Sequence, residues 1–399
     1  MTGCRDGSYQ GECLNRSYDI VICGGGVAGL WLLNVLTKAG YDVLLIEKDA
    51  LGGNQTIASQ GMIHGGQRYL LGTNPSNHAD SVAPLPERWD ACFAGHGELD
   101  LSRVRILNDT QVMWPTGGRL THLALNTATH LLKARTRKLG AHEVPAALRG
   151  SNDPHVYELP EKVIDVASLV EELSLPHRSR IRKGRVESLA RDGCLTVSGL
   201  QIKAQAIYCA AGVGNEELLM LLGAGQGLTQ RRPLRQLMVK TMPFPLYGHG
   251  ITTSYRPRVT VTSHPLRSGG FVWYLGGAIA DDTLTLTDDE AIAFAKKEMN
   301  AIFDNFDWSE KRWATWYCVR GEAYSQDGKL PSGPVVQEHG NVHIVWPTKL
   351  TLAPLLGDRV LTRLAEMEVL PKHAELSNQP LDLALPSIAP FPWEQVNWK

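Results

Sequence analysis

The 399-residue sequence lacks an excess of charge, a long apolar run and a paired-cysteine motif. Its 40 Lys and Arg residues against 41 Asp and Glu residues leave a formal net charge of −1, which removes the bulk electrostatic case for a nucleic-acid or polyanion binder. The longest stretches without Asp, Glu, Lys or Arg, 20–37 and 50–67, have 18 residues each, and 241–255 has 15, whereas a membrane-spanning helix needs roughly 20 apolar residues. We therefore expect no transmembrane segment, while peripheral membrane contact stays open.

The seven cysteines are odd in number and never fall in a C-x-x-C pair, which argues against a disulfide framework or a zinc site. We expect reduced thiols and no metal. Residues 1–17 are polar and charged, without an apolar run before a small-residue cleavage site, so they are typical of a loose arm rather than a signal peptide. Both observations predict a cytoplasmic protein.

Glycine is abundant, with 39 residues, and three glycines form the first motif. Gly24, Gly26 and Gly29 follow an expected buried strand, 18–23, and open an expected helix, 27–38. In this G-x-G-x-x-G pattern the first glycine allows a tight turn, the second lets backbone approach a pyrophosphate and the third lets the helix pack closely on the strand. The helix N-terminus then faces the phosphates, so the pattern predicts a bound dinucleotide.

A second expected strand, 42–46, ends at Glu47, 18 residues beyond Gly29. An acidic side chain at this point can accept hydrogen bonds from both ribose hydroxyls and disfavours a 2′-phosphate. Strand, glycines, helix, strand and acid thus occur in order within one short segment. The motif alone does not separate NAD from FAD, because both present the same ADP half.

The stretch 51–69 reads L-G-G-N-Q-T-I-A-S-Q-G-M-I-H-G-G-Q-R-Y. It resembles the D-amino-acid-oxidase-like superfamily of FAD enzymes, and its I-H-G-G-x-R-Y part most resembles FAD-dependent glycerol-3-phosphate dehydrogenases. L-2-hydroxyglutarate oxidases carry a similar I-H-x-G string. Three further stretches, 205–212, 319–321 and 346–354, resemble this superfamily in the same order. The resemblance implies FAD as the cofactor and an α/β fold, with a Rossmann-type FAD-binding domain and a second domain of mostly antiparallel sheet plus helix.

Strand and helix patterns divide the chain further. In the second domain we expect strands at 234–240, 258–263, 271–276 and 312–319 and a helix at 288–306, and after them a strand at 342–346 and a helix from about Thr351. The predicted organisation is a loose arm at 1–17, an FAD-binding domain at 18–75, 155–225 and 341–370, an insert or cap at 76–154, a substrate domain at 226–340 and a C-terminal tail at 371–399.

The resemblance also implies which residues contact the cofactor. They are Gly24, Gly26, Val27, Ala28, Gly29, Glu47, Lys48, Thr56, Ser59, Gln60, Gly61, Met62, Val186, Ala211, Gly212, Lys349, Leu350 and Thr351. Monomeric sarcosine oxidases attach flavin through a cysteine in this part of the fold, so Cys318 is a candidate for covalent attachment, with a buried strand thiol as the default.

Five residues carry the chemistry that the resemblance implies. His64 is suited to accept a hydroxyl proton, or is a hydrogen-bonded core histidine. Arg68 and Arg320 are candidates to clamp a carboxylate or phosphate, or form ordinary ion pairs. Lys349, just before an expected helix, is placed to stabilise negative charge on reduced flavin or substrate, or is a surface lysine. Tyr69 is a candidate donor to the substrate or a packed aromatic.

The leading interpretation is an FAD-dependent oxidoreductase, either a dehydrogenase or an oxidase. It moves a hydride from a C–H bond of a small anionic substrate, a hydroxy acid or polyol phosphate, to flavin N5, and electrons pass on to oxygen or a quinone. One alternative keeps the FAD and oxidises an amine or amino acid. Another is a non-catalytic flavin-binding protein. An NAD-dependent dehydrogenase is disfavoured by the T-L-A-P string at 351–354.

Overall fold

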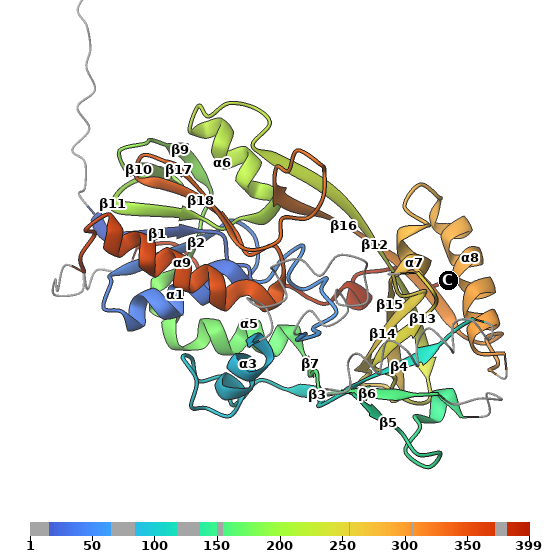
Figure 1. Cartoon of the computed structure of the whole chain (residues 1–399). Helices are drawn as coiled ribbons and strands as arrows, with labels where there is room; N and C mark the ends of the chain where they lie inside the picture. The colour runs from blue at the N-terminus through green and yellow to red at the C-terminus, as the bar shows by residue number, and fades with distance from the viewer. Residues whose placement is uncertain are drawn as a thin grey trace, which may run out of the picture.

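The computed structural model describes residues 16–64, 84–117, 136–149, 155–254, 256–304, 306–371 and 381–399. The predicted site residues Arg68 and Tyr69 lie outside these ranges. Two large sheets lie side by side, and two long strands, β12 (Thr229–Met242) and β16 (Arg312–Ala323), extend from one toward the other (Figure 1). The predicted α/β class with a second, mostly antiparallel domain is confirmed.

The first sheet is mainly parallel. Its strands run in the order β17 (Val335–His339), β18 (Val342–Trp346), β11 (Leu200–Cys209), β1 (Arg16–Cys23), β2 (Val43–Glu47) and β8 (Ile181–Lys183), and β10 (Cys194–Val197) joins β11 to β9 (Val186–Leu189). The edge strand β17 is antiparallel to β18. Short apolar runs such as V-L-L-I in β2 fit strands covered on both faces.

Helices cover one face of the first sheet. They are α1 (Val27–Lys38), α9 (Ala353–Glu366), α5 (Val166–Ser174) and, further out, α3 (Leu85–Phe93). α1 is buried along most of its length because it is apolar all round. Its one buried amide, Asn34, donates to the carbonyls of Leu30 and Leu173 and so ties α1 to α5. The other face packs against β9, β10 and α6 (Asn215–Leu221).

The second sheet has the order β16, β12, β15 (Phe271–Gly276), β14 (Val259–Pro265), β13 (Gly248–Ile251), β4 (Gln111–Pro115), β6 (Tyr157–Leu159) and β5 (Arg137–Lys138). All pairs are antiparallel except β13 with β4. A small ladder joins β3 (Ile106–Asn108) to β7 (Val163–Ile164). Short 3-10 turns occur at η2 (Ala146–Leu148), η3 (Leu175–Arg180), η4 (Gly212–Gly214), η5 (Leu350–Leu352) and η6 (Pro392–Glu394).

The two faces of the second sheet differ in polarity. The apolar face is covered by α7 (Ala278–Asp281) and α8 (Asp288–Ile302), and its core includes Leu237, Trp273 and Trp313. On the opposite face, which we call the polar face, buried polar side chains project from neighbouring strands: Gln111, Gln236, His249, Thr260, Thr262 and His264. Segment 51–64 packs on this face, where Tyr274 Oη donates to the carbonyl of Ala58. The polar face is therefore directed toward the first sheet.

Most expected elements form where the sequence placed them. α1, β15 and β18 match their predicted bounds, and Asp165 caps α5 by accepting from the N–H of Ser168. α8 begins at a capping box of Thr287 and Glu290 but ends at Ile302 rather than 306. The strands β4, β5, β6 and β13 were not predicted. They are only two to five residues long, and their partners are remote in the sequence except in the pairing of β13 with β14, so local patterns carry little signal for them.

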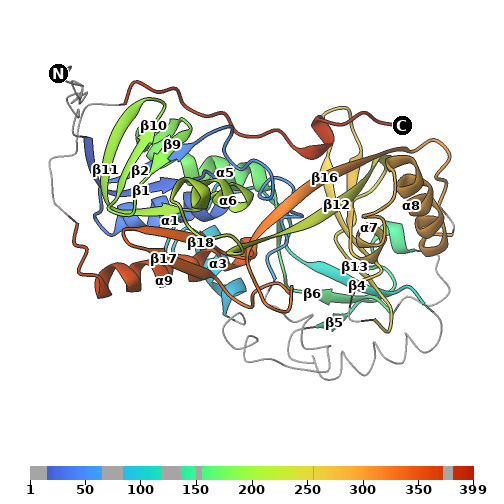
Figure 2. The ribbon, with the colours of Figure 1, turned by 90° about the horizontal axis from the view of Figure 1, so that it is seen from above.

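The C-terminal segment, residues 381–399, crosses both sheets (Figure 2). Backbone hydrogen bonds join it to the first sheet and its loops, from Lys183 to Ala384 and from Leu51 to Ser387. It then packs Phe391 and Trp393 against the ring of His264 and ends in a two-way backbone pairing of Lys399 with Trp313. These contacts make the segment a strap over both halves of the molecule.

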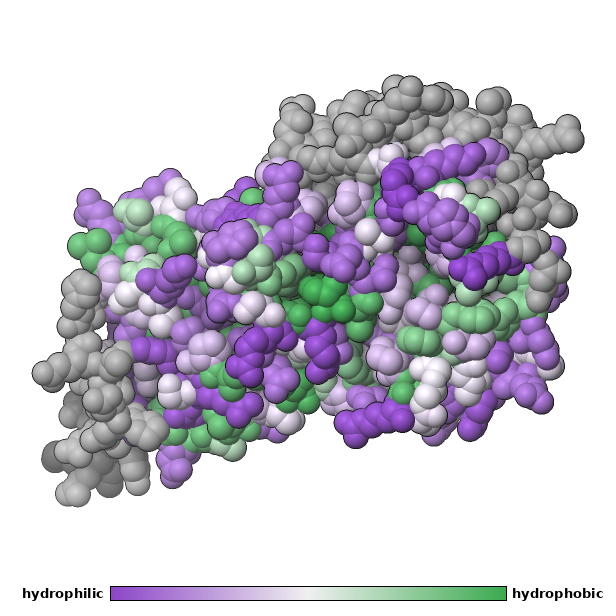
Figure 3. Space-filling model, turned by 90° about the horizontal axis from the view of Figure 1, so that it is seen from below, coloured by the Kyte–Doolittle hydropathy of each residue, from purple (hydrophilic) through white to green (hydrophobic). Residues whose placement is uncertain are grey.

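The surface shows small apolar groups rather than one large patch on the face seen from below, where green side chains are interspersed with purple ones outside the grey areas (Figure 3). Among the helices of the described ranges, none combines the length and the apolar content needed to cross a bilayer.

Candidate functional site

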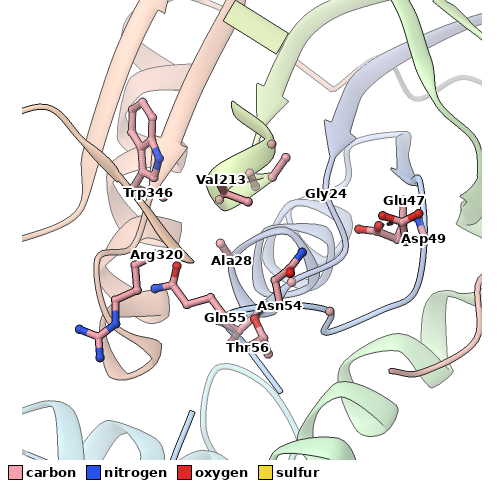
Figure 4. Close-up of a pocket in the computed structure, with 18 of the residues that line it drawn as sticks. Gly24, Ala28, Glu47, Asp49, Asn54, Gln55, Thr56, Val213, Arg320 and Trp346 are labelled. Carbon is pink, nitrogen blue, oxygen red and sulfur yellow. Dashed lines mark hydrogen bonds between the residues drawn. The ribbon is translucent and has the colours of Figure 1, made fainter. Parts of the chain in front are cut away.

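A cavity of about 300 Å³ lies at the carboxyl ends of β1, β2, β11 and β18 and extends to β12 and β16 of the second sheet. Ligands of open α/β sheets bind at this edge, outside the carboxyl ends of the strands. Figure 4 shows Glu47 and Asp49 on one side of the N-terminus of α1 and Gln55, Arg320 and Trp346 on the other. The cavity thus has a nucleotide end and a second-sheet end.

Backbone geometry builds the nucleotide end. Gly24 has φ 115°, and a Cβ there would lie 2.7 Å from the carbonyl oxygen of Ala210. A Cβ at Gly29 would lie 1.9 Å from the carbonyl oxygen of Gly24, so this glycine brings α1 onto β1. Gly26 is the N-cap of α1 and lines the cavity without a side chain, while the N–H of Val27 donates to Thr56 Oγ1. The arrangement exposes the positive end of a helix to the cavity.

Glu47 lies at the end of β2, as the sequence predicts. Its Oε2 accepts from the N–H of Gly25 at 2.6 Å, and its Oε1 accepts from the N–H of Asp49 at 2.8 Å. The carboxylate is held by backbone donors, and because each oxygen has two acceptor sites, each can still accept from a hydroxyl group.

A three-residue ion-pair cluster stands at the rim of the nucleotide end. Glu217 of α6 lies 2.5 Å from the guanidinium of Arg185 and 3.4 Å from Lys48 Nζ. All three residues line the cavity. The Arg185 hydrogen bond, followed by weaker attraction from Lys48, lowers the pKa of Glu217. Residues 177–185, H-R-S-R-I-R-K-G-R, form a basic run. Arg185 is the last residue of this run, and Glu217 is its ion-pair partner.

Side chains rather than backbone form the second-sheet end. Arg320 of β16, Gln236 and Leu234 of β12, and Gln60 line the cavity there. Arg320 is half-buried and makes no hydrogen bond or ion pair with any residue in the described ranges. Burial raises the pKa of the neighbouring Asp281, while Arg256 and then Arg320 pull it down. Arg320 therefore contributes positive charge to the cavity, and the carboxylate of Asp281 attracts it without forming a direct ion pair.

Lys349 reaches the same cavity from the first sheet. It follows Thr348, which has φ 64°, and is the N-cap of η5, where its carbonyl oxygen accepts from the N–H of Leu352, the last residue of η5. The neighbouring Trp346 and Leu350 also line the cavity. A half-buried lysine beside a helix start is suited to stabilise an anion.

The structure brings most of the predicted site residues together. The cavity is lined by Gly24, Gly26, Val27, Ala28, Glu47, Lys48, Thr56, Ser59, Gln60, Val186, Ala211, Gly212, Arg320, Lys349 and Leu350. Lining the cavity is a placement only, and the contacts of these residues with a cofactor stay predictions.

Five described residues from the predicted set do not line the cavity. Gly29 lies under Gly24, and a Cβ at Gly61 would lie 2.2 Å from the carbonyl oxygen of Ile164. Met62 forms an isolated bridge with Val163, and the buried Thr351 accepts from Trp89 Nε1 through its carbonyl oxygen. His64 follows Ile63, whose N–H donates to the carbonyl of Lys162. The structure thus places Lys349 and Arg320 at the cavity and His64 outside its lining.

Sequence reasoning missed several lining residues. Asp49, Asn54 and Gln55 lie between Glu47 and Thr56, so their place in the chain could have indicated them. Glu217, Leu234 and Gln236 belong to a helix and a strand without a motif, and no local signal marks them. Cys318 is absent from the lining, and burial raises the pKa of its thiol, which favours the buried strand thiol over covalent attachment.

The cavity fits a flavin dinucleotide. The glycine turn and the start of α1 can hold a pyrophosphate, Glu47 a ribose and Val186 an adenine. Ser59 Oγ lines the cavity, is buried and has no hydrogen-bond partner among the described residues, so a ligand atom would satisfy it. A Rossmann-type domain joined to a polar sheet across one cavity defines the class of two-domain flavoprotein oxidoreductases.

Comparison with known proteins gives the family. The family described as FAD dependent oxidoreductase matches residues 19–363, and the chain belongs to it. It is 40% identical over 387 residues to the probable FAD-dependent oxidoreductase PA4991 of Pseudomonas aeruginosa, covering 95% of this chain and 98% of that protein. The crystal structure of that relative superposes with a TM-score of 0.82, at 38% identity and with the same two coverages.

Two further similarities are more distant. The FAD-bound structure of L-alpha-glycerophosphate oxidase from Mycoplasma pneumoniae has a TM-score of 0.66 at 17% identity, covering 88% of this chain and 95% of that one, and shows likeness of fold. A glycerol-3-phosphate dehydrogenase of Pseudomonas tolaasii is 42% identical over 57 residues, which is 14% of this chain and 11% of that protein. The protein is an FAD-dependent oxidoreductase, and the prediction of FAD rather than NAD is confirmed.

Proposed function

We propose that this enzyme oxidises a carbon that bears a hydroxyl group in a small anionic substrate, a hydroxy acid or a polyol phosphate. The observation that carries the proposal is Arg320, a half-buried cavity arginine without a hydrogen bond or ion pair to the described part of the chain. Neighbouring arginines differ in this respect: Arg232 pairs with Glu322, and Arg256 with Asp281 and Asp282. An arginine left unpaired beside a cavity is suited to bind a carboxylate or phosphate by two parallel hydrogen bonds.

Bound FAD supplies a ring that accepts a hydride from the substrate carbon and passes the electrons on to oxygen or a quinone. The residues of the chain have other tasks. Arg320 fixes the anionic group, and Lys349 with the start of η5 stabilises negative charge at the second-sheet end. His64 remains our candidate to take the hydroxyl proton. Its position outside the cavity lining makes this the least supported role.

Two findings support a hydroxylated anion in particular. The local identity to a glycerol-3-phosphate dehydrogenase points to an alcohol next to a phosphate. The charge at the second-sheet end is positive, from Arg320 and Lys349, which favours anions over cationic amines. We also propose a cytoplasmic location, which the free thiols of Cys23, Cys92, Cys194, Cys209 and Cys318 support.

The test is anaerobic reduction of the flavin, which is monitored through the loss of the flavin's visible absorbance. Hydroxy acids, polyol phosphates and amino acids are mixed in turn with the enzyme. We expect at least one hydroxylated anion to bleach the flavin, and we expect Arg320→Met to lower the second-order rate of bleaching by about 10²-fold or more, since a charged hydrogen-bonded contact is lost.

Arg267 provides the matched control, because it is exposed and does not line the cavity. Arg267→Met should bleach at the rate of the unaltered enzyme. Bleaching by amines but not by hydroxylated anions, or an unchanged rate in Arg320→Met, would refute the proposal.

A further inference from the structure

Two glutamine side chains meet over Gly276, the last residue of β15. A Cβ at this position would lie 2.8 Å from Oε1 of Gln60 and 3.3 Å from Oε1 of Gln236. Gly276 does not have a positive φ, so its backbone conformation does not require glycine. Glycine is needed here for space, because any side chain would displace the two amides. We call Gln60 and Gln236 the amide pair.

The hydrogen bonds of Gln60 leave only its oxygen available. Its Nε2 donates to the carbonyl oxygens of Tyr274 at 3.0 Å and Thr260 at 3.3 Å, on two neighbouring strands. Both donors of the amide are thus engaged, which fixes the orientation of the group. Its Oε1 accepts no hydrogen bond from a described residue and lies beside the cavity that Gln60 lines.

Gln236 presents a second acceptor at the same point. The residue is 4% exposed, lines the cavity, and has a buried Oε1 without a hydrogen-bond partner among the described residues. A buried amide oxygen without a donor destabilises the protein, so such an atom is normally satisfied by a ligand or water. A donor placed between the two oxygens, from a ligand or from Gln236 Nε2 after rotation of its amide, would satisfy both.

The polar face holds the amide pair in place from behind. Thr260, whose carbonyl oxygen accepts from Gln60, also places its Oγ1 2.9 Å from Nδ1 of His249. Nε2 of His249 lies 3.0 Å from Oε1 of Gln111. This chain of contacts spans β14, β13 and β4 and restricts the backbone that orients Gln60. A site fixed in this way loses little entropy when a ligand binds.

We propose that the amide pair is the specificity site for a hydrogen-bond donor on the substrate, a hydroxyl or amino group on the carbon next to the anionic group. The inference rests on the proposed function, in which Arg320 holds the anionic group at the same end of the cavity. Gln236 is then a specificity-determining residue that selects against ligands without a donor, because these leave its oxygen buried and unpaired.

The experiment measures the binding of propionate, lactate and alanine to the FAD-loaded enzyme by isothermal titration. These acids share a carboxylate and differ at the second carbon, which carries hydrogen, hydroxyl or amino. We expect lactate or alanine to bind about 10-fold more tightly than propionate or better. In Gln236→Met, which keeps the length but loses the acceptor, the ratio should fall to within about 2-fold. Gln236→Glu, which keeps acceptor oxygens, should restore it.

Two controls separate the possible causes. Gln395 is exposed and lies outside the cavity lining, so Gln395→Met should leave the ratio unchanged. Arg320→Met should weaken all three ligands without changing their ratio. If Arg320→Met binds all three acids as tightly as the unaltered enzyme does, the proposed function is wrong, and the affinity ratio of lactate or alanine to propionate still tests the amide pair. If none of the three acids binds, the proposal of an anionic substrate is wrong. The affinity ratio of propane-1,2-diol to 1-propanol then tests the amide pair.

A ratio near 1 in the unaltered enzyme, or a ratio that survives in Gln236→Met, overturns the inference. The amide pair could instead accept a hydrogen bond from the N–H of the flavin ring. This alternative is tested by measuring the affinity of the apoprotein for FAD by equilibrium dialysis. We expect Gln236→Met to bind FAD with unchanged affinity. A large loss of FAD affinity with an unchanged ligand ratio would assign the amide pair to the cofactor and overturn the substrate role.

Discussion

The first sheet is buried by apolar side chains on both faces, whereas the second sheet is apolar on one face and mixed on the other, where a cluster including Met238, Tyr274 and Trp393 lies beside the polar side chains. In the first sheet the ligand end is formed by backbone at the carboxyl ends of strands, together with the side chain of Glu47 and the ion-pair cluster of Glu217, Arg185 and Lys48. In the second sheet, polar groups such as Gln111 Nε2, Thr262 Oγ1 and His264 Nε2 are buried without hydrogen-bond partners among the described residues. The comparison supports our proposal that the first sheet binds the cofactor and the second sheet selects the ligand.

The largest effect on FAD binding is expected from Gly29→Ala, which tests whether the first sheet acts through backbone contact. The added Cβ would overlap the carbonyl oxygen of Gly24 at 1.9 Å, so α1 must move away from β1. We expect FAD to bind at least about 10-fold more weakly, since the helix N-terminus shifts. The FAD content of the purified protein measures it. The control is Gly225→Ala, where a Cβ would meet no atom within 4 Å. If Gly29→Ala retains the FAD content of the wild-type protein, close backbone contact in the first sheet is not needed for FAD binding.

The next effect is a loss of stability when Trp393, a residue of the C-terminal segment that packs on the polar face, is removed. Trp393 is 8% exposed, stacks 4.3 Å from the ring of Phe391 and lies 4.2 Å from that of His264. Trp393→Ala should lower the free energy of unfolding by about 3–5 kcal/mol through the cavity it leaves. Urea denaturation measures the loss. Trp393→Phe, which keeps a ring, should lose less than half as much, and equal losses would show that the ring does not matter.

A smaller, pH-dependent effect should arise from His264 on the same face. Burial lowers its pKa to about 4 from an ordinary value of 6.5, so between these pH values the unfolded chain binds a proton that the folded chain does not. Stability from this residue is therefore present above pH 6.5 and falls as the pH drops, by up to about 1.4 kcal/mol for each pH unit.

His264→Phe should flatten this part of the pH profile, measured by urea denaturation at pH 7 and at about pH 5, where the difference is about 2 kcal/mol at most. His96 is exposed, and His96→Phe should keep the wild-type slope. If His264→Phe keeps the wild-type slope of stability against pH, the lowered pKa of buried His264 is not the cause of the pH dependence.

The smallest effect is expected at the rim of the first sheet. Glu217→Gln removes a carboxylate that pairs with the solvent-exposed Arg185 and Lys48, so we expect the free energy of unfolding to fall by less than about 1 kcal/mol. The rim becomes more positive while FAD carries two negative phosphates, so we expect release of FAD to be about 2- to 5-fold slower at low salt. Added salt should bring the two release rates together. Glu216→Gln on the same helix, whose partner is Arg231, should release FAD at the wild-type rate. A difference that persists at high salt would contradict an electrostatic cause.

The sequence predicts the nucleotide end well because its features are local. Gly24, Gly26 and Gly29 act through space and φ, and these needs can be recognised within one strand, turn and helix. The second-sheet end could not be predicted to the same depth. Gln236 is one polar residue in a long strand, and its meeting with Gln60 depends on a sheet register between segments that are far apart. The three-dimensional pairing of strands, not any local pattern, creates that site.

Lys349 and His64, both candidate site residues from the sequence, show the same limit. Lys349 reaches the cavity because it follows β18, which pairs with β11 in the first sheet, and the apolar run 342–346 predicts that strand. His64 was assigned through the resemblance of its string, and the direction of a side chain after an isolated bridge cannot be deduced from a string. Its catalytic role stays a prediction.

The paired strands β12 and β16 have a mechanical consequence. They form an unbroken antiparallel ladder from Thr229 with Ala323 to Lys240 with Arg312, and the cavity residues Leu234, Gln236 and Arg320 all belong to it. A hinge between the halves of the molecule would have to bend or break this two-stranded beam, whose bonds reinforce one another along its length. We therefore expect the β12–β16 ladder to stay rigid. Substrate would then enter through rearrangement of segments around the cavity rather than through rotation of one half of the molecule against the other.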